Sequence, residues 1–114
     1  MQLIFVYNAD SGRLNALFDI AHKIVRPETY ECSLCMLTHG TLSEKKAWTE
    51  FRQSKDTDFV FLHKDEFERQ YGLVYEYPVI LKQADILEVA LDADEIRKLR
   101  TVEELTAEIR KLTA

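Results

Sequence analysis

The chain has 114 residues, which is the length of one domain, so we expect a single domain over residues 1–114. Hydrophobic residues make up 46% of it and charged residues 31%, and this balance excludes an intrinsically disordered chain. The net charge is -5 and the Lys and Arg residues are mixed with Asp and Glu, which argues against a nucleic-acid partner and against binding to an anionic membrane surface.

The N-terminal segment predicts where the protein resides. The apolar residues 1–7 lack a basic leader and are followed by Asn8, Asp10 and Gly12, so we expect no signal peptide. No apolar run approaches the length of a membrane span. We therefore expect a cytoplasmic protein whose two cysteines are reduced, because lasting disulfides are rare in that compartment.

The first half of the chain begins with a strand and a helix. Residues 3–7 form a continuous apolar run of β-formers, which predicts a buried strand. Turn and cap residues follow, and the apolar spacing over 13–25 predicts a helix that ends before Pro27. Residues 28–40 are compatible with a short strand or an irregular loop. The capping-box pattern at 41–44 predicts a helix that reaches about Gln53 and buries Ala47, Trp48 and Phe51.

The second half alternates strands and helices. The unbroken apolar run 59–62 predicts a central strand, parallel to 3–7 and buried on both faces. Residues 65–71 predict a short helix that stops at Gly72. Strands over 77–81 and 86–91 should then form a hairpin, since four residues separate them.

The chain ends in helical segments that begin with capping patterns at Asp92 and Thr101. The last of them carries an apolar stripe with helical spacing, formed by Val102, Leu105, Ile109 and Leu112. Strands that alternate with helices predict a layered α/β domain, with one mixed sheet and helices packed on both faces.

From residue 59 onward this order resembles the second half of the thioredoxin-like fold. In that family a strand begins just after a cis proline, pairs with a final antiparallel strand and is covered by a terminal helix. Pro78 takes the proline position, so the resemblance implies a small thioredoxin-like sheet and a cis Tyr77–Pro78 bond. The redox cysteines of thioredoxins lie where the first strand meets the first helix. Here that junction, residues 8–12, has no cysteine.

The whole chain also resembles a small bacterial family of uncharacterised proteins. The resemblance lies in Tyr-Asn-Ala-Asp-Ser-Gly at 7–12, Cys-x-Leu-Cys at 32–35 and Phe-Leu-His-Lys-Asp-Glu-Phe at 61–67. It implies no activity, so the chemistry has to be inferred from the residues themselves.

The pair Cys32 and Cys35 is the most distinctive chemical feature of the sequence. Two cysteines at this spacing can present both thiolates to one metal ion, and a structural zinc site commonly adds two histidines. The chain has three, which we rank as ligands in the order His22, His39 and His63. We therefore expect a metal site, with zinc as the ion, in a structural or a sensing role.

Two alternatives remain open for the same cysteines. A Cys-x-x-Cys pair can catalyse thiol–disulfide exchange, with one thiolate attacking and the other resolving the mixed disulfide. Glu31 opposes this, because a carboxylate beside a thiol disfavours the thiolate. In the other alternative, Cys32 and Cys35 fill the core of an interaction module that has no active site.

Two strand-to-helix junctions are further candidates. The loop 8–12 and the segment that starts at His63 should share one end of the sheet if their strands are parallel neighbours. Asp10 or Ser11 is expected to cap the helix, and His63 with Asp10 could form an acid–base pair. The sequence has no nucleotide-binding, hydrolase or zinc-protease motif, so any enzyme activity is expected to be thiol–disulfide exchange.

Overall fold

The computed structural model of the protein describes residues 1–12, 33–38, 45–54 and 57–113. Within these ranges the elements, in chain order, are β1 (Gln2–Tyr7), α2 (Ser33–Thr38), α3 (Lys46–Ser54), β2 (Asp58–His63), α4 (Lys64–Tyr71), β3 (Val79–Gln83), β4 (Leu87–Leu91), α5 (Ala93–Arg97) and α6 (Val102–Thr113). The helix expected over 13–25 and the capping box at 41–44 lie outside the described residues. None of the helices in the described ranges has the length and apolar character needed to span a membrane.

The strands form one mixed sheet in the order β2-β1-β3-β4. β1 is parallel to β2 and antiparallel to β3, and β3 is antiparallel to β4. The predicted α/β fold with a mixed sheet is therefore confirmed. The central position expected for the 59–62 strand is wrong, because among the described strands β2 lies at one edge of the sheet and β1 lies inside it.

The apolar run of β2 results from helices on both faces of the sheet, and not from a central position between two strands. Phe59 and Phe61 pack against the apolar cluster on one face of the sheet, whereas Val60 and Leu62 pack against the cluster on the other. Helices on both faces thus favour apolar residues at each of the four positions 59–62 of β2. Burial of its two faces does not determine whether a strand lies on each side of it.

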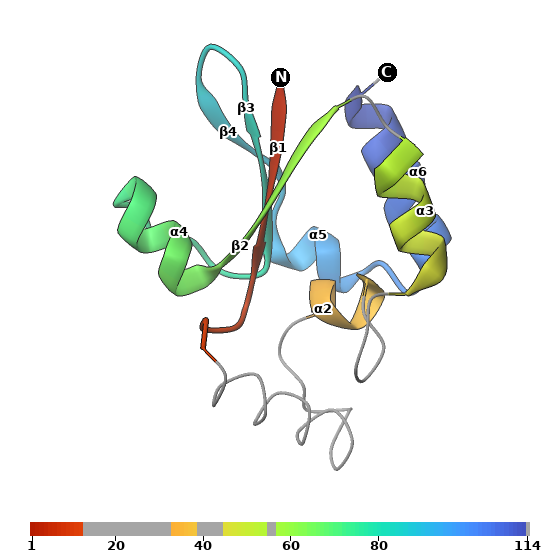
Figure 1. Ribbon diagram of the computed structural model, residues 1–114, viewed down its shortest axis with the longest axis horizontal. Helices are drawn as coiled ribbons and strands as arrows, with labels where there is room; N and C mark the ends of the chain where they lie inside the picture. The colour runs from red at the N-terminus through yellow and green to blue at the C-terminus, as the bar shows by residue number, and fades with distance from the viewer. Residues whose placement is uncertain (13–32, 39–44, 55–56, 114) are drawn as a thin grey trace.

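The first face of the sheet is covered by α2, α3, α5 and α6, and we call it the four-helix face (Figure 1). Leu3, Phe5 and Tyr7 of β1 point to this side because alternate residues of a strand share a face. The helices contribute a large apolar cluster, whose members include Leu34, Leu37, Trp48, Phe51, Ile96, Val102, Leu105 and Ile109. This cluster contains most of the core.

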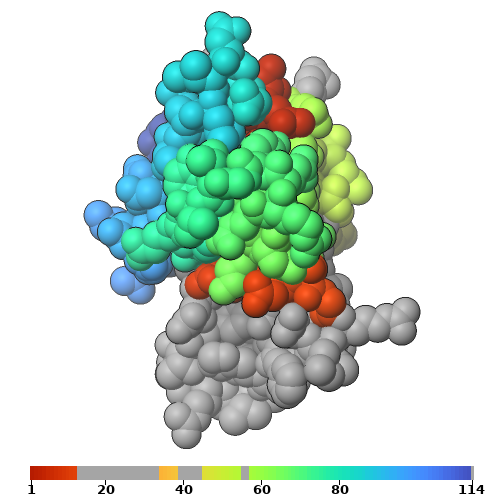
Figure 2. All heavy atoms as spheres, turned by 90° about the vertical axis from the view of Figure 1, so that its left-hand side faces the viewer, coloured from red at the N-terminus to blue at the C-terminus, as the bar shows by residue number. Residues whose placement is uncertain are grey.

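The second face is covered by α4, and we call it the α4 face. Ile4 and Val6 of β1 point to this side and pack with Phe67 of α4. Figure 2 shows α4 spread over this face, with the segment that follows β1 along one border of the helix. Helices therefore lie on both faces of the sheet, as predicted.

Local sequence signals set most of the element boundaries. Gly72 ends α4 in the left-handed conformation at φ 68°, which glycine adopts without a steric penalty. Asp92 caps α5 in a capping box with Glu95, and the Thr101 hydroxyl accepts a hydrogen bond from the Glu104 N–H at the start of α6. The apolar stripe of α6 is buried as expected at Val102, Leu105 and Ile109, and partly buried at Leu112.

The structure tests the expectations for three individual segments. The Tyr77–Pro78 bond is cis, as predicted, and the strand starts after it, at Val79. Residues 33–38, expected as a strand or an irregular loop, form the helix α2. Ala47 was expected to be buried but is exposed, because one helical step from Trp48 turns its side chain away from the sheet.

Candidate polar site at the ends of two parallel strands

The two candidate junctions lie at the same end of the sheet. Tyr7, the last residue of β1, is paired with His63, the last residue of β2. The N–H of Lys64 donates a hydrogen bond to the Ala9 carbonyl at 3.1 Å, so the backbones stay together past the strand ends. The prediction that parallel strands bring these junctions to one end is confirmed.

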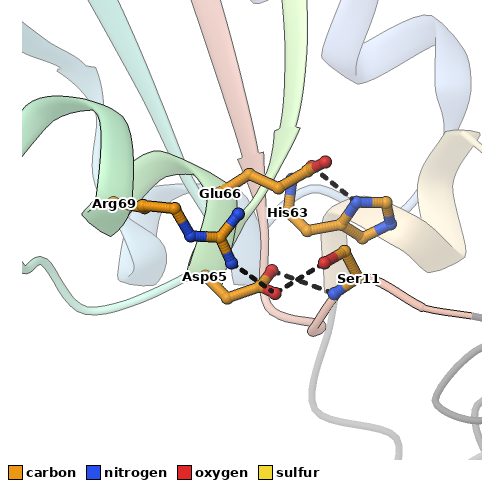
Figure 3. A network of polar contacts seen from close by, with 5 residues as sticks. All are labelled: Ser11, His63, Asp65, Glu66 and Arg69. Atoms are coloured by element: carbon orange, nitrogen blue, oxygen red, sulfur yellow. Dashed lines mark hydrogen bonds and ion pairs between the residues drawn. The ribbon is translucent and has the colours of Figure 1, made fainter.

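Asp65 fixes the segment that follows β1 to the first turn of α4. Its Oδ1 accepts a hydrogen bond from the Ser11 N–H at 2.9 Å, and its Oδ2 accepts one from the Ser11 hydroxyl at 2.6 Å (Figure 3). Arg69, one turn further along α4, lies 3.8 Å from the same Oδ2. The Ser11 hydroxyl is the main cause that lowers the pKa of Asp65 from its ordinary value, so this carboxylate is ionised at neutral pH.

His63 and Glu66 form a second pair beside the first. Glu66 Oε1 accepts a hydrogen bond from the His63 N–H at 2.8 Å and lies 2.8 Å from His63 Nδ1. The backbone N–H and then the ring of His63 lower the pKa of Glu66. Because an ionised carboxylate can only accept a hydrogen bond, the His63 Nδ1–H is the donor in this contact.

The expected acid–base pair between His63 and Asp10 is not formed, because the carboxylate beside the His63 ring is Glu66. His63 is the N-cap of α4, and a Glu at the third helical position can reach back to the N-cap backbone. The spacing of three between His63 and Glu66 is therefore the signal that the sequence offered for this pair. Nothing in the sequence indicated the contact between Ser11 and Asp65.

Cys35 lies in α2, on the four-helix face of the sheet. Its side chain is 8% exposed and belongs to the same apolar cluster as Leu34, Leu37 and Tyr7. Figure 1 shows α2 at the end of the sheet where β1 and β2 terminate. The sulfur of Cys35 is not a free thiol, because this residue is disulfide-bonded.

The predicted zinc ligands are only partly within the described residues. Cys32, His22 and His39 lie outside them, whereas Cys35 and His63 lie inside. Within residues 1–12, 33–38, 45–54 and 57–113, no three His, Cys, Asp or Glu side chains gather in a way that could hold a metal ion. Zinc binding, which depends on the residues outside these ranges, stays a prediction.

Comparisons of the chain with protein-family models, with curated proteins and with solved structures found no match. The candidate site is therefore described from the structure and sequence of this chain, and it consists of two groups of residues. The first is the polar cluster of Ser11, His63, Asp65, Glu66 and Arg69 at the strand ends. The second is the cysteine segment, of which Cys35 is described.

Proposed function

We propose that this protein carries out thiol–disulfide exchange through Cys32 and Cys35. The observation that carries the proposal is the disulfide-bonded state of Cys35. We take Cys32 as its partner, because the sequence contains two cysteines and their spacing of three is that of redox-active pairs.

The arrangement of the sheet supports this proposal. β3 begins directly after Pro78, pairs with the final antiparallel strand β4, and is followed by α6 on the four-helix face. These are the features that the resemblance to thioredoxin-like proteins implies. The cysteines come after the first predicted helix, so the proposal places the redox pair at residues 32–35, with Cys35 inside α2, rather than at residues 8–12.

The burial of Cys35 favours a division of roles between the two sulfurs. Thiol–disulfide exchange requires access to the attacking sulfur, and the Cys35 side chain is 8% exposed. We assign the attack to Cys32: its thiolate bonds to one sulfur of a substrate disulfide, and the other substrate sulfur leaves as a thiolate. Cys35 then attacks Cys32 in the mixed disulfide, which releases the second substrate thiol and leaves the Cys32–Cys35 disulfide, two electrons having passed to the substrate.

Zinc binding and exchange use the two sulfurs in different states. Zinc is bound by cysteine thiolates, whereas exchange passes through a disulfide. Both functions require the same two residues, but they predict different properties of the reduced protein. A zinc protein holds about one metal ion per chain after reduction, whereas an exchange protein cycles between dithiol and disulfide.

The test is the reduction of insulin by dithiothreitol with and without the purified protein. We expect the wild-type chain to accelerate it and the Cys32→Ser variant to lose the acceleration. The Cys35→Ser variant should instead accumulate a covalent mixed disulfide with the substrate, visible by mass spectrometry, because the resolving sulfur is missing. Ser33→Ala, between the two cysteines, is the matched control and should keep the activity.

Two results would count against the proposal. One is a wild-type rate equal to that of dithiothreitol alone. The other is zinc near one ion per chain in reduced protein that was purified without chelator or affinity metal, lost in both cysteine variants. The second result would establish the zinc site in place of the exchange reaction.

A further inference from the structure

β2 is an edge strand whose outer side is open in the described part of the chain. β1 is its neighbour in the sheet, and no other described strand pairs with it. In Figure 1, β2 crosses in front of β1, and no described helix or strand lies in front of it. Within the described residues, the outward backbone N–H and C=O groups of β2 thus have no strand partner, and such an edge is a template for another strand.

The two edges of the sheet differ in how they are protected. Proteins discourage pairing at an edge with charged residues, prolines or bulges within the strand. At the β4 edge, Glu88 lies within the strand and is exposed, and the pairing of β3 with β4 shifts register between Ile80 and Leu81. β2 has the apolar run 59–62 between Asp58 and His63 and a regular register along all six residues.

Symmetry limits how β2 can pair with a second copy of itself. Directly opposed residues of an antiparallel pair lie on the same face of the sheet, so a two-fold dimer must be centred on one residue. Centring on Val60 places Asp58 opposite Leu62, a charge against an apolar side chain. Centring on Phe61 places Phe61 opposite itself, Val60 opposite Leu62, Phe59 opposite the His63 ring, and Asp58 opposite Lys64.

The register centred on Phe61 is complementary in charge. His63 has an extended backbone, with φ -77° and ψ 157°, so the strand direction continues to Lys64. The Asp58 carboxylate accepts a hydrogen bond from the amide of Gln2, and the Lys64 ammonium donates one to the amide oxygen of Asn8. Both partners are neutral, so each charge is available for an opposite charge across the dimer axis.

We propose that two copies of this chain associate through antiparallel β2 strands centred on Phe61, which joins two four-stranded sheets into one. Each dimer then contains two Asp58–Lys64 pairs related by the two-fold axis. The proposal is independent of the exchange reaction, because it uses none of the cysteine residues.

The experiment is sedimentation equilibrium over a concentration series, on the wild type and on charge variants. Asp58→Lys places two positive charges opposite each other twice per dimer, so the dissociation constant should rise about tenfold or more. The double variant Asp58→Lys with Lys64→Asp restores opposite charges with the signs exchanged and should return most of the affinity. Glu88→Lys, on the β4 edge, is the matched control and should change nothing.

Amide exchange on the wild type gives a second measurement that requires no variant. Amides of β2 should gain protection as the concentration rises through the dissociation constant, whereas those of β4 should not. A wild-type chain that stays monomeric up to about 0.5 mM would overturn the proposal. So would a dimer that gains protection at β4, or one in which the double variant binds no better than Asp58→Lys.

Discussion

The two faces of the sheet differ in the contacts that hold their helices. One face is covered by α2, α3, α5 and α6, and the other is covered by α4. On the four-helix face the Phe5 ring lies 5.6 Å from Trp48, 5.4 Å from Phe59 and 4.9 Å from Phe61, between ring centroids. On the α4 face Phe67, the buried residue of α4 itself, anchors the helix. Polar contacts at both ends of α4 supplement it.

These polar contacts connect α4 to segments that precede and follow it. Asp65 in its first turn holds Ser11, and Glu68 accepts a hydrogen bond from the Tyr77 hydroxyl at 2.8 Å. An isolated helix of eight residues is unstable in water, so α4 depends on Phe67 and on these contacts. We therefore expect the four-helix face to set global stability and α4 to unfold locally next to the polar site.

The largest effect is expected from Phe5→Ala, on the four-helix face. Phe5 is fully buried and contacts three aromatic rings, so its removal leaves a large cavity and should lower the free energy of unfolding by about 4 kcal/mol. Urea denaturation measures the change. Val89→Ala, at a side chain that is 44% exposed, is the control and should cost about 0.5 kcal/mol at most.

Phe67→Ala on the α4 face should cost about 3 kcal/mol, and the loss should be local. Without its buried ring, α4 has no fully buried side chain to hold it on the sheet. Native-state hydrogen exchange should therefore show α4 amides losing protection while those of β1 and α6 keep theirs. An equal loss of protection in all three elements would show that the two faces unfold together.

Asp65→Asn should lower the free energy of unfolding by about 1 kcal/mol at neutral pH, since it removes a charged acceptor from Ser11. Ser11→Ala should have a similar effect, and the double variant should cost less than the sum of the two, because the variants remove one interaction. Additive costs would mean that Ser11 and Asp65 stabilise the protein separately.

The pH dependence of stability gives a second test of this contact. The pKa of Asp65 is lowered in the folded state, so its contribution is present above the unfolded value of 3.8 and is lost as the pH falls below it. Wild-type stability should therefore fall more steeply below about pH 4 than that of Asp65→Asn. Equal slopes would show that Asp65 has the same pKa in both states.

The smallest effect is expected from Tyr77→Phe, at about 0.5 kcal/mol at neutral pH. The change keeps the ring but removes the hydroxyl that donates to Glu68. Burial, assisted by Glu68, raises the pKa of Tyr77 to about 12, so an alkaline titration of the wild type should contain a late phenol transition that the variant lacks. In Tyr71→Phe, the control, the late transition should remain.

Signals that act within one segment predicted much of this fold. The apolar run of β1, the stripe of α6 and the stop at Gly72 each depend on residues close in sequence, and each is found as expected. The edge position of β2 depends instead on which strand lies beside it, and a run buried by helices on both faces resembles a central strand. α2 is a helix of six residues, too short for a periodic pattern to identify.

In the polar site, too, local sequence signals predicted some features, whereas contacts between distant residues were not predicted. The common end of the two junctions followed from the parallel pairing of β1 and β2, and the pair of His63 and Glu66 has a local spacing of three. Ser11 and Asp65 are separated by 54 residues, so their contact depends on the final position of α4 over the end of β1. A sequence pattern can place both residues near the same end of the sheet without specifying which side chains meet.

The positions of Trp48 and of the tyrosines give the two faces separate optical signals. Trp48 is the single tryptophan of the chain, is fully buried on the four-helix face, and lies 5.9 Å from the Phe51 ring. Three of the five tyrosines, Tyr71, Tyr75 and Tyr77, instead surround Phe67 on the α4 face. Tryptophan fluorescence therefore reports the loss of one layer, while near-ultraviolet dichroism from tyrosine also senses the other. Unfolding curves from the two signals coincide only when both layers open in one cooperative transition.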